Sequence, residues 1–231
     1  MENLRQASDV IVDYTKQLKL RIHLKDDPDL TYSSSDGQKA EVAQDSLLAR
    51  SSFKYFGNRK GVSAYNYADD TLLLFDSLVF SAGDREATYL LNGLINTQVV
   101  DSDVHSTDSH GATELVFAAT HLSGIRFEPR IKNFLRQQLY SIEPISHYKD
   151  QNYVLMPNGR INTERIMEQW DSILRLMATI RLHYSSPSEL FNRLNSYAAE
   201  NPLYRFGRLI KSIFLMRYID NVRVCQRVHR Q

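Results

Sequence analysis

Cysteine is almost absent from this sequence, since Cys225 is the only one among 231 residues. A single thiol excludes an internal disulfide and a cysteine-rich zinc site. Long apolar stretches are also missing, because the run Leu72–Phe75 is interrupted at once by Asp76. The first residues, Met1–Gln6, lack the apolar core of a signal peptide. These absences predict a soluble protein of a reducing compartment without a membrane partner, and we expect it in the cytoplasm.

Several enzyme motifs are absent as well. The sequence contains no nucleophile elbow, no phosphate-binding glycine loop and no dinucleotide-binding fingerprint. Its composition is otherwise ordinary for a globular protein, with 42% hydrophobic and 24% charged residues, so neither disorder nor a fibrous repeat is indicated. The length allows one large domain or two small ones around a substantial core.

Charge is unevenly distributed along the chain, although the net charge is only +1. Residues 201–231 hold seven of the 28 basic residues and one of the 27 acidic residues, a net charge of +6. The 21 basic and 26 acidic residues that remain give residues 1–200 a net charge of −5. This asymmetry suggests that the basic end faces a polyanion, although arginines on a helix surface are common without any ligand. The seven basic residues are Arg205, Arg208, Lys211, Arg217, Arg223, Arg227 and Arg230.

Apolar periodicity predicts mixed helices and strands in the first part of the chain. Residues 4–19 have the spacing of an amphipathic helix. Gly61–Tyr67 and Thr71–Phe80 alternate like strands and are expected to pair as an antiparallel hairpin through Asp69-Asp70. In the first of these strands either Val62 and Ala64 or Ser63 and Tyr65 face the interior. The other expected elements are a strand at 30–34, a helix after Gly83-Asp84, a short strand ending before Asp108, and a helix over 112–122 that stops at Gly124.

The last part of the chain is expected to be helical. Asn162 can cap a helix that carries apolar residues from Ile166 to Ile180. Ser186-Pro187-Ser188-Glu189 has the form of a capping box with proline at the first helical position. Asn201-Pro202 repeats the combination of cap and proline before another apolar helix. Three consecutive capped helices are therefore predicted.

Two short acidic segments are candidates for chemistry. Ser35-Asp36-Gly37 and Thr107–Gly111 each place an aspartate where an extended stretch meets small, turn-forming residues. Two carboxylates at strand ends are suited to a divalent cation, which prefers anionic oxygen ligands. Each segment also has an ordinary explanation, since aspartate and glycine favour turns and Asp108 can cap the following helix.

Other polar residues near these segments carry weaker signals. Asp101 and Asp103 are expected to lie on a different strand face from Asp108 and to be solvated. His105, His110 and His121 match no common zinc spacing. His110 can contact a phosphate or orient Asp108.

Several motifs in register resemble the catalytic region of the Tn3 family of replicative (class II) transposases. The resemblance runs in order from about residue 30 onward and covers nearly all of the chain. The motifs are Ser34–Gln38, Lys54–Gly57, Gly61–Tyr65, Thr107–Gly111, Leu122–Ile131 and Tyr204–Lys211.

The resemblance implies a mixed α/β, RNase H-like catalytic domain with an Asp-Asp-Glu triad. Asp36 corresponds to the first aspartate and Asp108 to the second, 72 positions later. Both would be metal ligands in a two-Mg²⁺ site, with ions about 4 Å apart that stabilise the attacking and leaving oxygens of DNA. The partners implied are transposon-end and target DNA, with multimers of the protein acting on paired ends. Candidate DNA contacts are His110, Arg126, Arg130, Arg205, Arg208 and Lys211.

The third acid of the triad is expected to be absent. In the family the glutamate follows a segment that resembles Arg223–Gln231, where this sequence ends. Four glutamates lie in a different motif context: Glu164, Glu168, Glu189 and Glu200. The long N-terminal part of the family is also missing, which predicts a truncated transposase or a fragment of an interrupted gene. Strand transfer by this chain is expected to be impaired or absent.

We expect three parts along the chain, namely a helical lead-in over 1–23, an RNase H-like core over 24–145, and a helical insertion with a basic end over 146–231. A second function remains open. The chain could be a non-catalytic DNA-binding or interaction module that contacts phosphates through its basic C-terminal helices.

Overall fold

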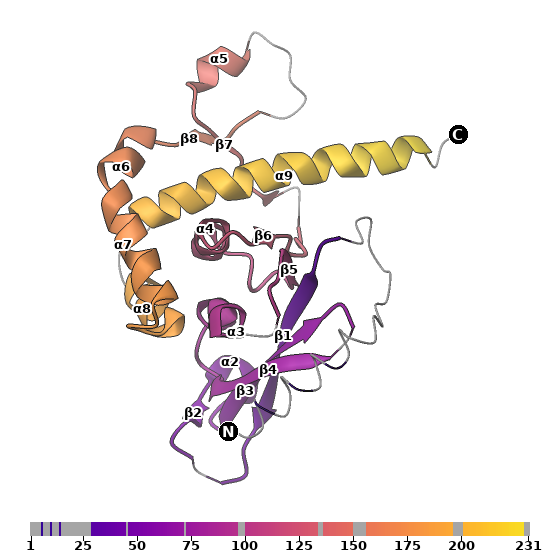
Figure 1. The fold of residues 1–231 in the computed structure, drawn as a ribbon, viewed down its shortest axis with the longest axis vertical. Helices are drawn as coiled ribbons and strands as arrows, with labels where there is room; N and C mark the ends of the chain where they lie inside the picture. The colour runs from indigo at the N-terminus through magenta and orange to yellow at the C-terminus, as the bar shows by residue number, and fades with distance from the viewer. Residues whose placement is uncertain are drawn as a thin grey trace.

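The computed structural model describes residues 6, 10, 14, 29–44, 46–71, 73–96, 100–133, 136–149, 156–195 and 201–228. The predicted helix over 4–19 lies largely outside these residues. Within it, Gln6, Val10 and Tyr14 have helical backbone and exposed side chains. In the described part the chain forms a curled mixed sheet with helices against it (Figure 1), which confirms the mixed α/β class. No described helix is both long and apolar enough to cross a membrane.

The ten-residue strand β1 (Tyr32–Glu41) is the centre of the main sheet. It pairs antiparallel with β3 (Lys60–Asp69) on one side and parallel with β5 (Val104–Thr107) on the other. Beyond β5 lies β6 (Arg126–Phe127), also parallel. The far edge of β3 is shared by β4 (Leu74–Ser81) and the short β2 (Arg50–Ser51). The order β4-β3-β1-β5-β6 is consistent with the RNase H-like fold that the resemblance implies.

The predicted hairpin of β3 and β4 is confirmed. Its turn is closed by the buried Asp69, whose carboxylate accepts hydrogen bonds from the backbone N–H groups of Thr71 (2.9 Å) and Leu73 (3.1 Å). Of the two possible orientations of β3, the one with Ser63 and Tyr65 inward is observed. The sheet therefore buries tyrosines and a serine on the face that the helices cover.

The segment Ser35-Asp36-Gly37 is not a turn, which corrects the sequence-based expectation. It lies in the middle of β1, which continues to Glu41 because β3 pairs with it as far as Gly61. Gly37 is needed here for space. A Cβ atom on Gly37 would lie 2.7 Å from the carboxyl carbon of Glu86. The expected turn after Asp108, in contrast, is present at residues 109–111.

Helices of the first half pack against one face of this sheet. The 3-10 turn η1 (Glu86–Thr88) and α3 (Leu90–Asn96) follow β4 as predicted, and the four-residue α2 (Phe53–Phe56) follows β2. The helix α4 (Glu114–Leu122) follows β5. Its N-cap is Thr113, whose hydroxyl accepts from the N–H of Val116, so Asp108 is not the cap. Gly124, with φ of 83°, lies just beyond its C-terminal end.

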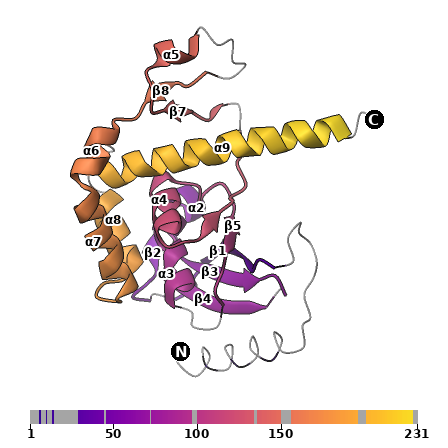
Figure 2. The same cartoon turned by 45° about the horizontal axis from the view of Figure 1, so that its top comes forward.

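The described part of the second half is mainly helical, and it includes the short strands β7 (Tyr140–Ser141) and β8 (Gly159–Arg160), which pair with each other. This pair and α5 (Ile145–Lys149) lie beyond α9 from the main sheet (Figures 1 and 2). The remaining helices are α6 (Thr163–Glu168), α7 (Trp170–Arg181), α8 (Pro187–Asn195) and α9 (Pro202–Val228).

All three predicted helix starts are confirmed. Asn162 accepts from the N–H of Arg165 at 3.1 Å, Ser186 from that of Glu189 at 3.3 Å, and Asn201 from that of Leu203 at 2.9 Å. The helix predicted after Asn162 differs in one respect, because it is broken at Gln169 into α6 and α7.

The long helix α9 crosses α4 at close range. Gly207 makes this possible, since a Cβ atom there would lie 1.8 Å from the carbonyl oxygen of Glu114. Phe117 of α4 packs against Phe214 of α9 with ring centroids 5.5 Å apart. One continuous core therefore joins the inner sheet face to the helices, and it includes Tyr65, Tyr67, Leu90, Leu91, Val116, Phe117, Ile180, Phe191 and Leu203.

Candidate metal centre

Asp36 and Asp108 line one pocket at the centre of the sheet. In the parallel ladder of β1 and β5 the last pair is Ser35 and Thr107, and each aspartate directly follows a member of that pair. Neighbouring strands are about 4.8 Å apart, and residues in register point to the same face. Two positions that are 72 residues apart in sequence are thus brought together by strand pairing alone.

Both aspartates line one open pocket of about 360 Å³ on the sheet face opposite the helices. Alternation along β1 places Asp36 on the exposed face, whereas Ser33 and Ser35 are buried. Asp108 is partly exposed. The lining residues are Ser34, Ser35, Asp36, Asn66, Ala68, Leu74, Ser106, Thr107, Asp108 and Arg130.

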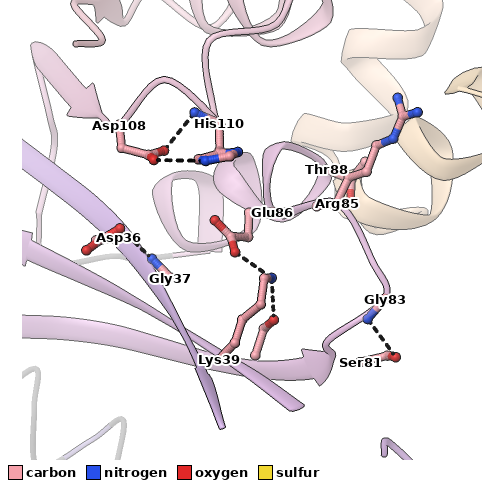
Figure 3. Close-up of polar contacts among 11 residues, drawn as sticks. Asp36, Gly37, Lys39, Ser81, Gly83, Arg85, Glu86, Thr88, Asp108 and His110 are labelled. Atoms are coloured by element: carbon pink, nitrogen blue, oxygen red, sulfur yellow. Dashed lines mark hydrogen bonds and ion pairs between the residues drawn. The ribbon is translucent and has the colours of Figure 1, made fainter. Parts of the chain in front are cut away.

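Each carboxylate is oriented by a nearby backbone N–H group (Figure 3). Asp36 Oδ1 accepts a hydrogen bond from the N–H of Gly37 at 2.9 Å. Asp108 Oδ1 accepts one from the N–H of His110, also at 2.9 Å, and its Oδ2 lies 3.9 Å from His110 Nε2. A carboxylate has about four acceptor positions, so both groups keep capacity for a further ligand. The backbone N–H of His110, which any residue at this position would supply, therefore orients Asp108.

The donor set suits a hard divalent cation such as Mg²⁺, which binds a few carboxylate oxygens and completes its shell with water and phosphate. Asp36 supplies one such group from within β1 and Asp108 a second from the residue after β5, and the pocket leaves room for other ligands. Among the described residues no three His, Cys, Asp or Glu side chains are close enough to hold an ion together. The described residues thus offer a metal ion two carboxylates in this pocket, those of Asp36 and Asp108.

A buried polar network lies on the opposite face of the same strands. His105 of β5 contacts Ser33 through Nδ1 (2.7 Å) and Ser35 through Nε2 (2.8 Å). The Ser35 hydroxyl contacts the Tyr65 hydroxyl at 2.9 Å, which in turn lies 3.5 Å from Thr107 Oγ1. Burial raises the pKa of Tyr65 to about 12, so its hydroxyl keeps its proton at neutral pH.

A nearly buried ion pair covers the neighbouring part of β1. Lys39 Nζ lies 2.7 Å from Glu86 Oε1 and 2.9 Å from Ser63 Oγ (Figure 3). The side chains of Lys39 and Glu86 are 14% and 13% exposed. Because the Glu86 carboxylate also rests on Gly37, this pair connects η1 to the strand beside Asp36. Neither Glu86 nor His105 was predicted from the sequence as a site residue. Their partners on β1 become apparent only once the strands are paired.

Of the other candidate residues, one lines the pocket of Asp36 and Asp108, and the rest make contacts elsewhere. Arg130 lines it together with both aspartates. Arg126 forms an exposed ion pair with Glu128 at 2.9 Å. Asp103, expected to be solvated, is exposed and accepts from the N–H of Thr31 at 2.8 Å. His121 packs beside Phe206, with ring centroids 5.8 Å apart.

Two basic residues of α9, Arg208 and Lys211, line a second pocket. It lies between α4, α9 and residues 136–140 and has a volume of about 190 Å³. The Arg208 guanidinium is 5.6 Å from the centre of the Tyr140 ring, and Lys211 Nζ is 4.0 Å from Glu114 Oε1. Arg136, which was not expected from the sequence, joins them. Arg205 lies on the same helix and is half-buried.

Comparison with known proteins gives consistent results. The profile described as the Tn3 transposase DDE domain matches residues 1–231. The chain is 30% identical to the transposase for transposon Tn1546 of Enterococcus faecium, over 98% of this chain and 23% of that protein. For the transposase of Tn501 of Pseudomonas aeruginosa the values are 30%, 87% and 21%, and for that of gamma-delta of Escherichia coli K12 they are 25%, 82% and 19%. No solved structure matches.

The chain spans roughly a fifth to a quarter of the length of these curated relatives. The family resemblance predicted from the ordered motifs is nevertheless confirmed along the whole sequence. The profile match and the similarity to several transposases agree with one another, and the mixed sheet with its paired aspartates is consistent with both. This chain belongs to the Tn3 transposase DDE domain family.

Proposed function

We propose that Asp36 and Asp108 are the metal-binding carboxylates of a DNA transposase core, whose reactions are phosphodiester cleavage and strand transfer. The observation that supports this is that both line one open pocket, and that each directly follows a member of the last pair of the β1–β5 ladder, Ser35 and Thr107. The substrates would be transposon-end and target DNA. A multimer acting on paired ends, as the family implies, is part of the same proposal.

The residues around the pocket have complementary roles in this proposal. Asp36 and Asp108 would hold Mg²⁺, which when bound stabilises negative charge on the attacking and leaving oxygens of a phosphodiester. Arg130 lines the same pocket and can pair with a DNA phosphate. His110 fixes Asp108 through its N–H group. The exposed sheet face leaves space for a DNA backbone.

Binding of a metal by two carboxylates alone is expected to be weak. Two carboxylates line the pocket among the described residues, and we propose that a core with these two alone has little or no strand-transfer activity. Robust cleavage of a transposon-end DNA by the purified chain, lost in Asp36→Asn, would contradict this part of the proposal while supporting the assignment of Asp36.

The direct test is calorimetric titration with Mn²⁺, which binds the same oxygen ligands as Mg²⁺. We expect Asp36→Asn and Asp108→Asn each to weaken binding more than about 10-fold, because each removes an anionic ligand. Asp101→Asn is the matched control, an exposed aspartate on the approach to β5, and should bind as the unmodified chain does. Equal affinity in all four proteins would refute the site.

A second function, DNA binding without catalysis, is favoured by the basic pocket. Arg136, Arg208 and Lys211 line it together with two glutamines and one acid, Glu114. A phosphate group entering it would meet three cations and the amide N–H groups of Gln137 and Gln138. For this second function, the pocket lined by Asp36 and Asp108 would not be needed.

Fluorescence anisotropy with duplex DNA at increasing salt tests this second function. Binding through phosphates should weaken steeply, and Arg136→Gln should reduce the logarithmic salt slope by about 1. Arg59→Gln is the control, since Arg59 is exposed and pairs with Glu41. Salt-independent binding, or the same slope in both variants, would exclude the pocket as a DNA contact.

A further inference from the structure

We propose that His105 is a positioning residue of the metal centre, which holds the β1 backbone at Asp36 in register with Asp108 through Ser33 and Ser35. This inference rests on the proposed function, because it assumes that the two carboxylates act together. It adds a residue on the far side of the sheet from the pocket.

His105 lies on the strand that leads to Asp108, and this strand pairs with the one that carries Asp36. It lies on β5 three residues before Asp108 and is opposite Ser33 in the parallel register. Its ring is fully buried. Nδ1 is 2.7 Å from Ser33 Oγ and Nε2 is 2.8 Å from Ser35 Oγ, so one ring spans two successive inward positions of β1. Asp36 directly follows the second of these.

The hydrogen atoms in this network can be assigned consistently. A neutral imidazole donates from one ring nitrogen and accepts at the other. If Tyr65 donates to Ser35, and Ser35 to Nε2 of His105, then Nδ1–H donates to Ser33, and the donors of Tyr65, Ser35 and His105 are each used once. The Tyr65 hydroxyl also lies within 3.5 Å of Thr107, so the network connects β1, β3 and β5.

The polarity of these strands is the strongest argument for a special role. Parallel strands that are covered by helices usually carry valine, isoleucine and leucine inward. Here the inward residues of the paired segment are Ser33, Ser35, His105 and Thr107, all of them buried. Burying hydroxyl groups and an imidazole costs free energy unless they pair specifically. Specific pairing fixes the register, and a slip of one residue would move Asp36 to the other face.

A purely structural role would make a different prediction. If His105 only stabilised the fold, any variant of equal stability would bind metal equally well. If it positions Asp36, the side chain that restores the contact to Ser35 should restore metal affinity best. The amide of glutamine can reach the place of Nε2, next to Ser35, whereas that of asparagine is limited to the place of Nδ1, next to Ser33.

The test is Mn²⁺ titration of the 231-residue chain and its variants. We expect His105→Leu to weaken Mn²⁺ binding about 10-fold, and His105→Gln to recover more of the affinity than His105→Asn. Tyr67→Phe is the matched control, since it removes a buried hydrogen bond of β3 to the carbonyl oxygen of Tyr89, outside the network. Unchanged affinity in folded His105→Leu and His105→Gln, or equal weakening in Tyr67→Phe, would overturn the inference.

Hydrogen exchange separates this inference from the proposed function. If the unmodified chain binds no Mn²⁺ in an Asp36-dependent way, the proposed function fails, but positioning can still be measured. His105→Leu or His105→Gln should then reduce the protection of the amides of Ser35, Asp36 and Gly37 more than that of amides in β4. A uniform change of protection across the sheet would contradict positioning.

Discussion

The two faces of β1 differ in nearly every property, although they alternate along the same ten residues. One face presents Asp36 and Gln38 to solvent, and the carboxylate of Asp36 is oriented only by its neighbour's N–H group. The other face presents Ser35, Gly37 and Lys39 to a buried network and an ion pair. The open face keeps unused acceptors for a ligand, whereas the covered face satisfies its polar groups internally.

This difference shows how a strand can serve chemistry and folding together. An acceptor that binds a metal must remain available, so it contributes little to stability. The rigidity that the site needs is then supplied by the buried polar groups on the covered face of the strand. Substitutions on the covered face should therefore change stability, and those on the open face should change ligand binding.

Within β1, the largest effect on stability is expected at Gly37. The variant Gly37→Ala places a methyl group within 2.7 Å of the Glu86 carboxyl carbon and should displace Glu86 from Lys39. We expect a loss of about 1–3 kcal/mol in the free energy of unfolding, measured with urea. Gln38→Ala, on the open face, is the control.

A double-mutant cycle sharpens this prediction. In a Glu86→Ala background the methyl group has space, so Gly37→Ala should cost much less there. If Gly37→Ala is as stable as the unmodified chain, Glu86 can move aside at no cost. The covered face would then be no more sensitive to substitution at this position than the open face.

Tyr65→Phe is expected to have the next largest effect. It removes a hydroxyl that contacts Ser35 and Thr107 and leaves both with one partner fewer. The expected loss is about 1–2 kcal/mol in urea unfolding. A loss near zero would mean that the network does not stabilise the covered face.

The pH dependence of stability offers a smaller, separate effect. Burial raises the pKa of Tyr65 to about 12 in the folded state, against about 10 for an unfolded tyrosine. Below pH about 10 both states keep the proton, so this group has no effect there. Between pH about 10 and 12 only the unfolded state releases it, so stability falls as pH rises.

Comparing the unmodified chain with Tyr65→Phe isolates this contribution. The slope of unfolding free energy against pH above about 10 should be smaller in the variant, by up to about 1.4 kcal/mol per pH unit. Some dependence should remain, because burial also raises the pKa values of Tyr67 and Tyr89. Identical slopes would contradict the burial of an uncharged Tyr65.

The smallest effect is expected on the open face. Ser77 donates a hydrogen bond to Asn66 Oδ1 at 2.7 Å, between β4 and β3. Because this bond is exposed to water, Ser77→Ala should change stability by less than about 0.5 kcal/mol. A loss as large as that of Tyr65→Phe would remove the energetic contrast between the faces.

Local sequence patterns predicted the individual helices and strands of this fold better than the pairing between strands that are distant in sequence. The caps at Asn162, Ser186 and Asn201 and the hairpin at Asp69 were predictable, since each depends on residues within a few positions. The strand through Ser35-Asp36-Gly37 was predicted as a turn, because local preferences for aspartate and glycine do not include the pairing of β1 with two distant strands.

The candidate site was predictable only in part for the same reason. The ordered motifs indicated Asp36 and Asp108, and their position on the wall of one pocket is consistent with that assignment. His105 was considered only as a zinc ligand, and its partners Ser33 and Ser35 lie 72 and 70 residues away in sequence. The domain limits at residues 23 and 145 and the roles of the arginines remain predictions.

Paramagnetic broadening by Mn²⁺ in NMR spectra of the labelled chain would test the central claim most directly. If Asp36 and Asp108 hold one cation together, the amide signals of residues 35–37 and 107–110 should broaden in parallel at low Mn²⁺. Signals of residues 126–127 should broaden less, and Asp36→Asn should abolish the effect in both segments. Broadening at only one of the two aspartates, or broadening that survives in Asp36→Asn, would contradict a shared metal site.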